Sequence, residues 1–302
     1  MQIAVAATPE VALPTLEALF VSGHDLVAVI TQPDRPAGRG LARKESPVAI
    51  WAKDHGIIVR KPVDQEELKL AVADIDLVIT IGFGVIIKEE VLNVPRHGFL
   101  NLHFSLLPKW QGAAPVQRAI EAGDQSTGIT VFQLDKGMDT GPIYRQKEIA
   151  MPDKATTSSL LQDLAAIGAP VVLDAIKAIE ANESPVIQSE IGRSRAEKLS
   201  KDEGRIDWQL PATKIERKIR AFYPAPGAWT TFRDEAIKIE SAETSEAKSG
   251  QPGEILLEGK ELFVSTSEGS LKIFTLKPAG KASMPAMDWV NGARIEPEAC
   301  FK

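Results

Sequence analysis

The sequence predicts an α/β chain of two domains, an open doubly wound sheet followed by a small β-barrel. Its 302 residues are about twice the length of a typical domain. In the first half, short apolar runs alternate with helical patterns, as in α/β folds. In the last hundred residues, short β-rich runs are separated by turn residues, which is typical of a small barrel.

The first half contains five apolar runs that we expect to be strands: 3–8, 26–31, 57–59, 76–83 and 98–104. Residues 11–20 and 47–55 carry helical patterns between them. Runs of this kind indicate parallel strands that are covered on both faces. After Thr127 we expect strands at 128–134 and 142–150, joined by the loop D-K-G-M-D-T-G, and then a helix over 156–181 with Thr156 as its N-cap.

The chain then becomes polar and rich in charge, which is typical of a linker. We expect a first domain over residues 1–189, a linker over 190–205 and a second domain over 206–302. The second domain should open with a short helix at 211–221. Its strands are expected at 227–232, 236–239, 254–257, 262–265 and 271–276.

Composition excludes several classes of protein. No run approaches the roughly 18 uninterrupted apolar residues of a membrane span, and the first residues lack the basic start of a secretory signal. A single cysteine, Cys300, excludes an internal disulfide framework, and the four scattered histidines give no metal-ligand spacing. We therefore expect a cytoplasmic protein without a membrane segment or a metal.

The net charge of −6 is unevenly distributed along the chain. Residues 1–204 hold 21 Lys+Arg against 27 Asp+Glu, whereas residues 205–302 hold 14 of each. A protein that coats DNA is excluded, because such domains are basic overall. A nucleic-acid face would have to be a local basic patch.

Open α/β sheets bind ligands beyond the carboxyl ends of their strands. The first strand ends in Ala-Ala-Thr-Pro-Glu and lacks the G-x-G-x-x-G pattern of dinucleotide sites, which argues against NAD or FAD. The expected strand 98–104 instead carries Asn101 and His103, which share a face because they are two residues apart. An amide beside an imidazole suits a carbonyl oxygen that becomes negative.

Asp139, in the loop D-K-G-M-D-T-G, could orient His103 or a water molecule. Together these three side chains suit the attack of an amine on an acyl or formyl carbon. Plainer roles remain open: Asn101 and His103 could bond to loops, and Asp139 could form an Asx-turn. Ser105 could be a nucleophile beside His103, but no G-x-S-x-G elbow surrounds it.

Several motifs make the sequence similar to the methionyl-tRNA formyltransferase family of the folate-dependent formyltransferase superfamily. They are T-Q-P-D-R-P-A-G-R-G (31–40), N-L-H-F-S-L-L-P-K-W-Q-G-A-A-P (101–115), G-M-D-T-G (137–141), A-E-K-L-S-K-D-E-G-R-I-D-W (196–208) and L-K-P-A-G-K (276–281). The resemblance implies a Rossmann-like formyltransferase domain and an OB-like C-terminal domain. It also implies formyl transfer from 10-formyltetrahydrofolate to the α-amino group of initiator methionyl-tRNA, through a tetrahedral oxyanion, for translation initiation.

The resemblance assigns roles to particular residues. The catalytic trio would be Asn101, His103 and Asp139. The tetrahydrofolate-binding segment would be Ser105, Leu106, Leu107 and Pro108, with residues 81–86 as a wall of the pterin pocket. Arg39 would contact the tRNA acceptor end. The implied partner is tRNA rather than DNA or a membrane, and the implied state is a monomer.

Three departures from the family pattern stand in the motifs. Ala-Ala-Thr-Pro replaces Gly-Thr-Pro, Phe83 replaces a common tyrosine, and Gln111 replaces a usual arginine. The alternatives are a formyltransferase that acts on a small amine, a 10-formyltetrahydrofolate hydrolase, and a non-catalytic tRNA-binding protein with the same fold.

Overall fold

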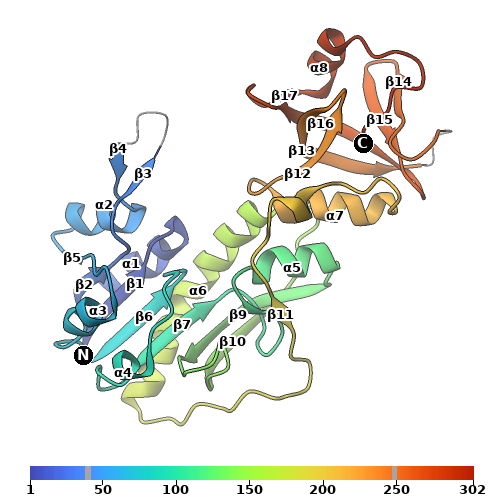
Figure 1. The fold of residues 1–302 in the computed structure, drawn as a ribbon. Coiled ribbons are helices and arrows are strands. Elements are labelled where there is room, and N and C mark those ends of the chain that lie inside the picture. Colours follow the sequence, from blue (N-terminus) through green and yellow to red (C-terminus); the bar gives the residue numbers. More distant parts are fainter. Residues whose placement is uncertain (38–41, 247–249) are drawn as a thin grey trace. The chain divides into compact units, whose positions relative to one another are not determined.

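A computed structural model describes residues 1–37, 42–246 and 250–302 (Figure 1). The chain forms two compact units. Unit 1 comprises residues 1–112, 126–150 and 161–196, and unit 2 comprises residues 113–125, 151–160 and 197–302. The limits predicted for the two domains and their linker stay a prediction.

Unit 1 is built on a seven-stranded mixed sheet in the order β10-β9-β7-β6-β1-β2-β5. Its parallel strands are β1 (Gln2–Ala7), β2 (Asp25–Ile30), β5 (Ile58–Arg60), β6 (Leu77–Ile81) and β7 (Phe99–His103). The antiparallel strands β9 (Ser126–Gln133) and β10 (Ile143–Ala150) complete it. The parallel strands expected from the apolar runs are confirmed, and the change of pattern after Thr127 marks the antiparallel edge.

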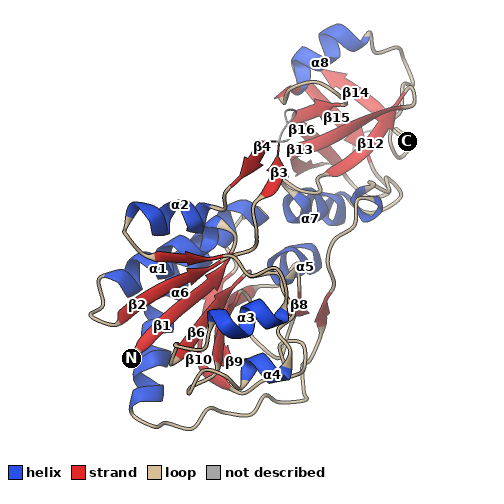
Figure 2. Cartoon of the chain, turned by 60° about the vertical axis from the view of Figure 1, so that its left-hand side comes forward, coloured by secondary structure: helices blue, strands red, loops and turns tan. Residues whose placement is uncertain are grey.

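Helices cover both faces of this sheet (Figure 2). They are α1 (Leu13–Phe20), α2 (Pro47–Asp54), α3 (Gln65–Ala71), α4 (Glu89–Leu92) and α6 (Thr157–Glu180). Leu68 of α3 and Val91 of α4 share a buried cluster with Phe99. On the opposite face, a Cβ at Gly168 of α6 would lie only 2.7 Å from Leu102 Cδ2. Because Phe99 and Leu102 are three apart in one strand, their side chains point to opposite faces.

Helix α6 begins where the sequence predicts. The Thr156 hydroxyl accepts a hydrogen bond from the Ser159 N–H at 3.2 Å, which is the expected cap. Among the described residues, α6 is the helix that is long and apolar enough to cross a membrane by length and composition alone. Its Leu164, Val172 and Ile176 are fully buried, so α6 packs as a core helix of this protein.

Unit 2 holds an antiparallel sheet in the order β12-β13-β16-β15-β14, and β17 pairs with β16. These strands are β12 (Ala228–Phe232), β13 (Glu235–Ser245), β14 (Ile255–Glu258), β15 (Glu261–Ser265), β16 (Ser270–Pro278) and β17 (Met284–Pro285). The unit also contains α5 (Pro115–Ala122), α7 (Ala212–Phe222) and α8 (Ala286–Ala293). In its core Phe301 stacks on Trp208 and Trp289, and Phe232 packs edge-to-face against Trp289. The OB-like closure of this sheet stays a prediction.

One strand of unit 2 is longer than the sequence suggests. We expected a strand at 236–239, but β13 continues to Ser245. Its pairing with β16 shifts register between Ile239 and Ser241 and again between Ser241 and Ala242. These irregularities interrupt the alternation of buried and exposed residues, which is the signal on which the expectation relied.

Candidate active site

Asn101 and His103 lie at the carboxyl end of β7, as predicted. Asn101 stands opposite Thr80 of β6 and Phe132 of β9, and His103 stands opposite Thr130. Positions two apart in a strand share a face. The sheet therefore presents an amide and an imidazole side by side at a strand end.

The Asn101 amide is oriented by Thr80, a residue that the sequence analysis did not single out. The Thr80 hydroxyl donates to Asn101 Oδ1 at 2.8 Å and lies 3.0 Å from the Leu100 carbonyl oxygen. This bond occupies the amide oxygen. Within the described part of the chain, no hydrogen bond involves Asn101 Nδ2, so its two N–H groups are available to an oxygen that carries negative charge.

His103 is oriented through the backbone of Trp110. Its ring is 5% exposed, and Nε2 lies 2.9 Å from the Trp110 carbonyl oxygen. A carbonyl can only accept a hydrogen bond, so Nε2 carries the proton. The other nitrogen, Nδ1, lies 3.8 Å from Asp139 Oδ2. In the neutral ring Nδ1 is the atom that can take up a proton, and in the charged ring it faces a carboxylate.

Asp139 reaches the imidazole from the loop between β9 and β10. Its backbone has φ = 56°, the left-handed conformation that aspartate tolerates better than most residues. Its Oδ2 accepts a hydrogen bond from the Gly112 N–H at 2.7 Å. Asp135 shapes the start of the same loop, since its Oδ1 accepts from the Gly137 N–H and the Thr140 hydroxyl at 2.9 and 2.8 Å. The structure thus brings Asp139 and His103 together; their roles in a reaction stay predictions.

The segment from Ser105 to Pro108 follows β7 directly and is held by its neighbours. The Ser105 hydroxyl donates to the Lys109 carbonyl oxygen at 2.6 Å, so it is not paired with His103 as a nucleophile would be. The Thr130 hydroxyl contacts both the Ser105 carbonyl oxygen and the Leu107 N–H. The Leu107–Pro108 peptide bond is cis. The assignment of residues 105–108 as a folate-binding segment rests on sequence resemblance.

Two cavities open at the carboxyl ends of β1, β2 and β6. One, of about 310 Å³, is lined by Gln32, Pro33, Pro62, Val63, Asp64, Gln65, Leu68, Phe83 and Val85. The other, of about 320 Å³, is lined by Thr8, Pro9, Gln32, Pro33, Lys44, Ser46 and Gly82. Strand β1 lies between β2 and β6, so this is the point where strand order reverses and where such sheets bind ligands.

The loop Gly82–Phe83–Gly84 contributes Gly82 to the second cavity and Phe83 to the first. Both glycines have positive φ, 54° and 73°, which suits residues without a Cβ. The Phe83 carbonyl oxygen accepts a hydrogen bond from Gln32 Nε2 at 2.6 Å. Of residues 81–86, Gly82 lines the second cavity, and Phe83 and Val85 line the first; their role as a wall of the pterin pocket stays a prediction. Gln32 was missed, because its partner lies 51 positions away in the sequence.

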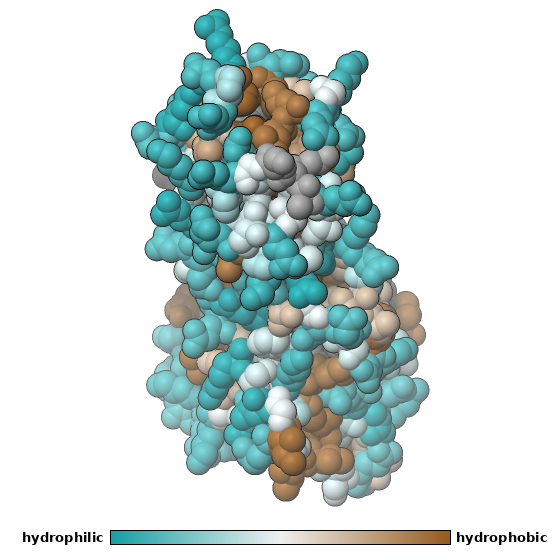
Figure 3. Space-filling model, turned by 90° about the vertical axis from the view of Figure 1, so that its right-hand side faces the viewer, coloured by the Kyte–Doolittle hydropathy of each residue, from teal (hydrophilic) through white to brown (hydrophobic). Residues whose placement is uncertain are grey.

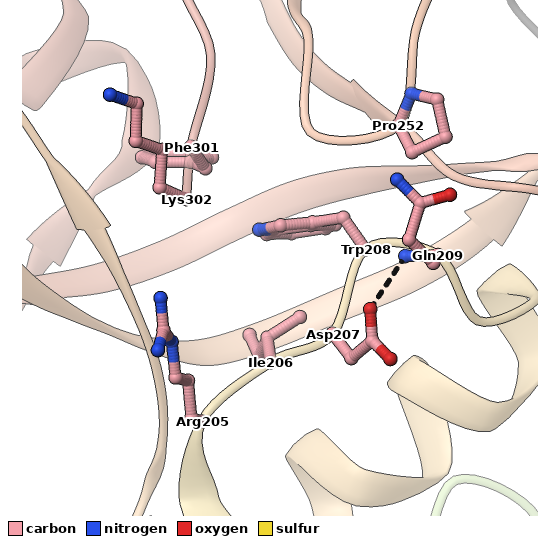
Figure 4. A pocket seen from close by; sticks show the side chains of 8 residues that line it. All are labelled: Arg205, Ile206, Asp207, Trp208, Gln209, Pro252, Phe301 and Lys302. Carbon is pink, nitrogen blue, oxygen red and sulfur yellow. Dashed lines mark hydrogen bonds between the residues drawn. The ribbon is translucent and has the colours of Figure 1, made fainter.

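Unit 2 contains a further cavity, of about 400 Å³. Figure 4 shows the eight side chains that line it, with Arg205 and Lys302 supplying cations and Asp207 an anion whose carboxylate accepts from the Gln209 N–H at 2.9 Å. Trp208 forms its inner wall, and the Trp208 indole N–H is bonded to the Thr230 hydroxyl. Arg39, the residue expected to contact the tRNA acceptor end, lies outside the described residues. In the described ranges, no group of three or more His, Cys, Asp or Glu could hold a metal ion.

Comparison with known proteins places this geometry in a family. Residues 1–176 match the formyl transferase family, and residues 198–294 match the formyl transferase C-terminal domain family. The chain is 43% identical over 303 aligned positions to the methionyl-tRNA formyltransferase of Salinispora tropica, with 98% of each chain covered. The chain belongs to the formyl transferase family. The family expected from the motifs is confirmed.

Solved structures share the fold of this formyl transferase. Methionyl-tRNA formyltransferase from Clostridium thermocellum superposes with a TM-score of 0.59 at 16% identity, covering 91% of this chain and 99% of that chain. HypX from Aquifex aeolicus in complex with tetrahydrofolic acid superposes with a TM-score of 0.66 at 20% identity, covering 96% of this chain and 47% of that chain. At such identities the likeness shows the fold alone.

Proposed function

We propose that this formyl transferase moves the formyl group of 10-formyltetrahydrofolate to the α-amino group of initiator methionyl-tRNA. The observation that carries the proposal is the arrangement of His103 Nδ1 and Asp139 Oδ2, 3.8 Å apart, beside the Asn101 amide. A full-length match to a methionyl-tRNA formyltransferase at 43% identity supports the choice of substrate.

The cavity beside Phe83 and the Ser105–Pro108 segment are the parts of unit 1 that would hold the folate. The cavity wall combines apolar Phe83, Val85 and Leu68 with the Gln32 amide, which suits a flat heterocycle with polar edges. The bound folate supplies an activated formyl carbon. Phe83 offers no hydroxyl there, so ring contact replaces the hydrogen bond of the usual tyrosine.

The trio then has separate tasks. The attacking amine must be neutral; a free α-amino group has a pKa of about 7.7–8.0, which leaves a neutral fraction at physiological pH. As it attacks, the formyl oxygen becomes negative and the Asn101 Nδ2–H groups stabilise it. His103 Nδ1 would take the proton that the attacking amine loses and return it to the folate nitrogen as the bond between that nitrogen and the formyl carbon breaks, while the Asp139 carboxylate stabilises the imidazolium.

The test is transfer of labelled formyl from 10-formyltetrahydrofolate to methionyl-tRNA, with uncharged tRNA and water as acceptor controls. Asn101→Ala and His103→Ala should each lower kcat about 100- to 1,000-fold, as loss of such groups does elsewhere. The matched controls Asn93→Ala and His97→Ala lie in the same unit and should retain full activity. Unchanged turnover in either trio variant would defeat the assignment, and folate consumption without labelled tRNA would point to the hydrolase.

Basic side chains at the start of unit 2 would contact the tRNA phosphates. Within the described residues, Lys198, Lys201 and Lys214 form no ion pair, whereas Arg220 is bound to Glu216. Changing the three lysines to glutamine should raise the KM for tRNA and reduce its salt slope by about 0.7–0.9 for each phosphate that is no longer neutralised. Lys260→Gln, in the same unit, should change neither. An unchanged salt slope in the triple variant would remove these lysines from the interface.

A further inference from the structure

In the segment that follows α6, apolar side chains are exposed and a polar side chain is buried. Val186, Ile187 and Ile191 are 70%, 85% and 88% exposed, whereas Gln188 among them is only 7% exposed. Apolar patches of this kind are visible among hydrophilic residues on the face shown in Figure 3. Burial of an amide is unfavourable unless its hydrogen bonds are made. The partners of Gln188 therefore indicate why it is buried.

Every strong hydrogen-bonding group of the Gln188 amide is used near the candidate active site. Its Nε2 donates to the carbonyl oxygens of Asp139 and Gly141, at 2.9 and 2.8 Å. Its Oε1 accepts from Gln111 Nε2 at 3.1 Å. Since both partners of Nε2 are carbonyls, the orientation of the amide is determined. Gln188 thus joins the Asp139 turn to β8 (Gln111–Gly112).

Gln188 supports Asp139 directly at its backbone carbonyl and supports its carboxylate only through the residue next to Gly112. Asp139 adopts φ = 56°, a conformation that costs roughly 1–2 kcal/mol in a residue with a Cβ and needs support from its surroundings. Its carbonyl is held by Gln188, and its carboxylate is held by the N–H of Gly112. Gly112 follows Gln111, the other partner of Gln188.

Gln188 is itself held on both sides. Val186 and Ile143 exchange backbone hydrogen bonds of 2.7 and 2.8 Å. Further along, β11 (Arg195–Ala196) pairs in parallel with β8. The segment 186–196, which we call the strap, is therefore anchored to β10 at one end and to β8 at the other. The backbone from which the Gln188 side chain projects is therefore held in place on both sides.

We propose that Gln188 is a positioning residue for formyl transfer, which acts by holding the Asp139 turn so that the carboxylate faces His103. The inference rests on the proposed function, because Asp139 must take part in the reaction for its position to matter. Gln111 assists as the donor to Gln188; its own Oε1 is buried and has no hydrogen-bond partner within the described chain. The strap, whose composition in the sequence is that of a polar linker, thus belongs to the site.

Kinetics of three variants test the proposal. Gln188→Leu removes both donors at similar size and should lower kcat about 10- to 100-fold, as displacement of a reacting group by about 1 Å does, with both KM values within two-fold. Gln111→Leu leaves those donors in place and should lower kcat by less. Ile187→Ala, the exposed neighbour on the strap, is the matched control and should be fully active. A raised KM with unchanged kcat in Gln188→Leu would overturn the proposal.

A double-mutant cycle with Asp139→Asn separates positioning from a general structural role. If Gln188 acts through Asp139, adding Gln188→Leu to Asp139→Asn should cost less than two-fold further. If Gln188→Leu lowered kcat as much in the Asp139→Asn enzyme as in the wild type, the proposal would be overturned, but the assignment of the catalytic trio would still stand. Full activity of Asp139→Asn alone would overturn the assignment of Asp139 and the proposal with it. Should Gln188→Leu fail to fold, the same cycle with Gln111→Leu gives the decision.

Discussion

Alanine at Gly112 should damage the site through one contact. Gly112 has φ = 128°, and a Cβ built there would lie 2.6 Å from the Ala196 carbonyl oxygen and 3.2 Å from its carbonyl carbon. Both neighbours are backbone atoms, so no side chain can rotate away. The methyl group must therefore push β8 away from β11 or twist the Gly112 backbone. The Gly112 N–H that bonds to Asp139 moves in either case.

The magnitude follows from these distances. An ordinary contact begins at 3.4 Å, so the backbone must yield by about 0.8 Å. The unfavourable φ costs roughly 1–3 kcal/mol, and weakening the hydrogen bond to a carboxylate costs a further ~1.5–3 kcal/mol. A total of about 2.5–6 kcal/mol corresponds to roughly 5–24 °C in the melting temperature of a unit this size. A displacement near 1 Å should lower kcat by up to about 100-fold.

Gly192→Ala provides the control. Gly192 lies on the strap with φ = 83°, but its Cβ would meet nothing within 4 Å. This variant should be destabilised only by its backbone conformation, by roughly 1–2 kcal/mol, and its kcat should be unchanged. Thermal unfolding by circular dichroism and initial formyl-transfer rates at saturating substrates, both taken well below the transitions, give the comparison. The reasoning would be refuted if the two variants lost equal amounts of stability and turnover, or if Gly112→Ala had an unchanged kcat.

Two further predictions concern hydrogen bonds made by individual side chains. Thr80→Val deletes the donor to Asn101 Oδ1 in a side chain of similar size. The variant should destabilise the fold by about 1 kcal/mol and lower kcat about five-fold. Thr80→Ser, which keeps the hydroxyl, should keep full activity, and steady-state kinetics of the two variants test this. Hydrogen bonds from Lys53 and then Lys61 lower the pKa of Glu45 to about 2. Glu45 therefore stabilises the fold above about pH 4.5, and this contribution is lost as the pH falls through 2. Melting curves should show a Glu45→Gln deficit at pH 7 that shrinks toward pH 2; a deficit independent of pH would contradict this.

The sequence predicts a strand most clearly where burial is complete along the strand. All residues of β6 are buried, and its run of apolar residues, interrupted only by Thr80, makes the strand recognisable. Helix α3 was not predicted, because Leu68 is its only buried residue and no apolar stripe marks it. Helix α4, of four residues, is too short for a periodic pattern, and helix α8, of eight residues, was also not predicted. Their positions depend on packing against partners distant in the chain.

The candidate site divides in the same way. Asn101 and His103 could be paired from the sequence, because their spacing of two needs only a strand to place them together. Thr80 and Gln188 could not, since they act on residues 21 and 49 positions away. The register of β6 against β7 selects Thr80. For Gln188 the local sequence gives no signal, because a glutamine in a polar segment is expected at the surface, and the structure buries its amide instead.

The orientation of His103 depends on two residues with unfavourable backbones. Trp110, whose carbonyl accepts from Nε2, has φ = 65°, and Asp139, which faces Nδ1, has φ = 56°. Each such backbone costs roughly 1–2 kcal/mol. The strap secures both: the Ser194 hydroxyl accepts from the Trp110 N–H at 2.9 Å, and Gln188 holds the Asp139 carbonyl. The residues that face the two ring nitrogens of His103 are therefore both held in place by the strap. This arrangement gives a physical reason for the strap to turn its amide and hydroxyl inward and leave its isoleucines exposed.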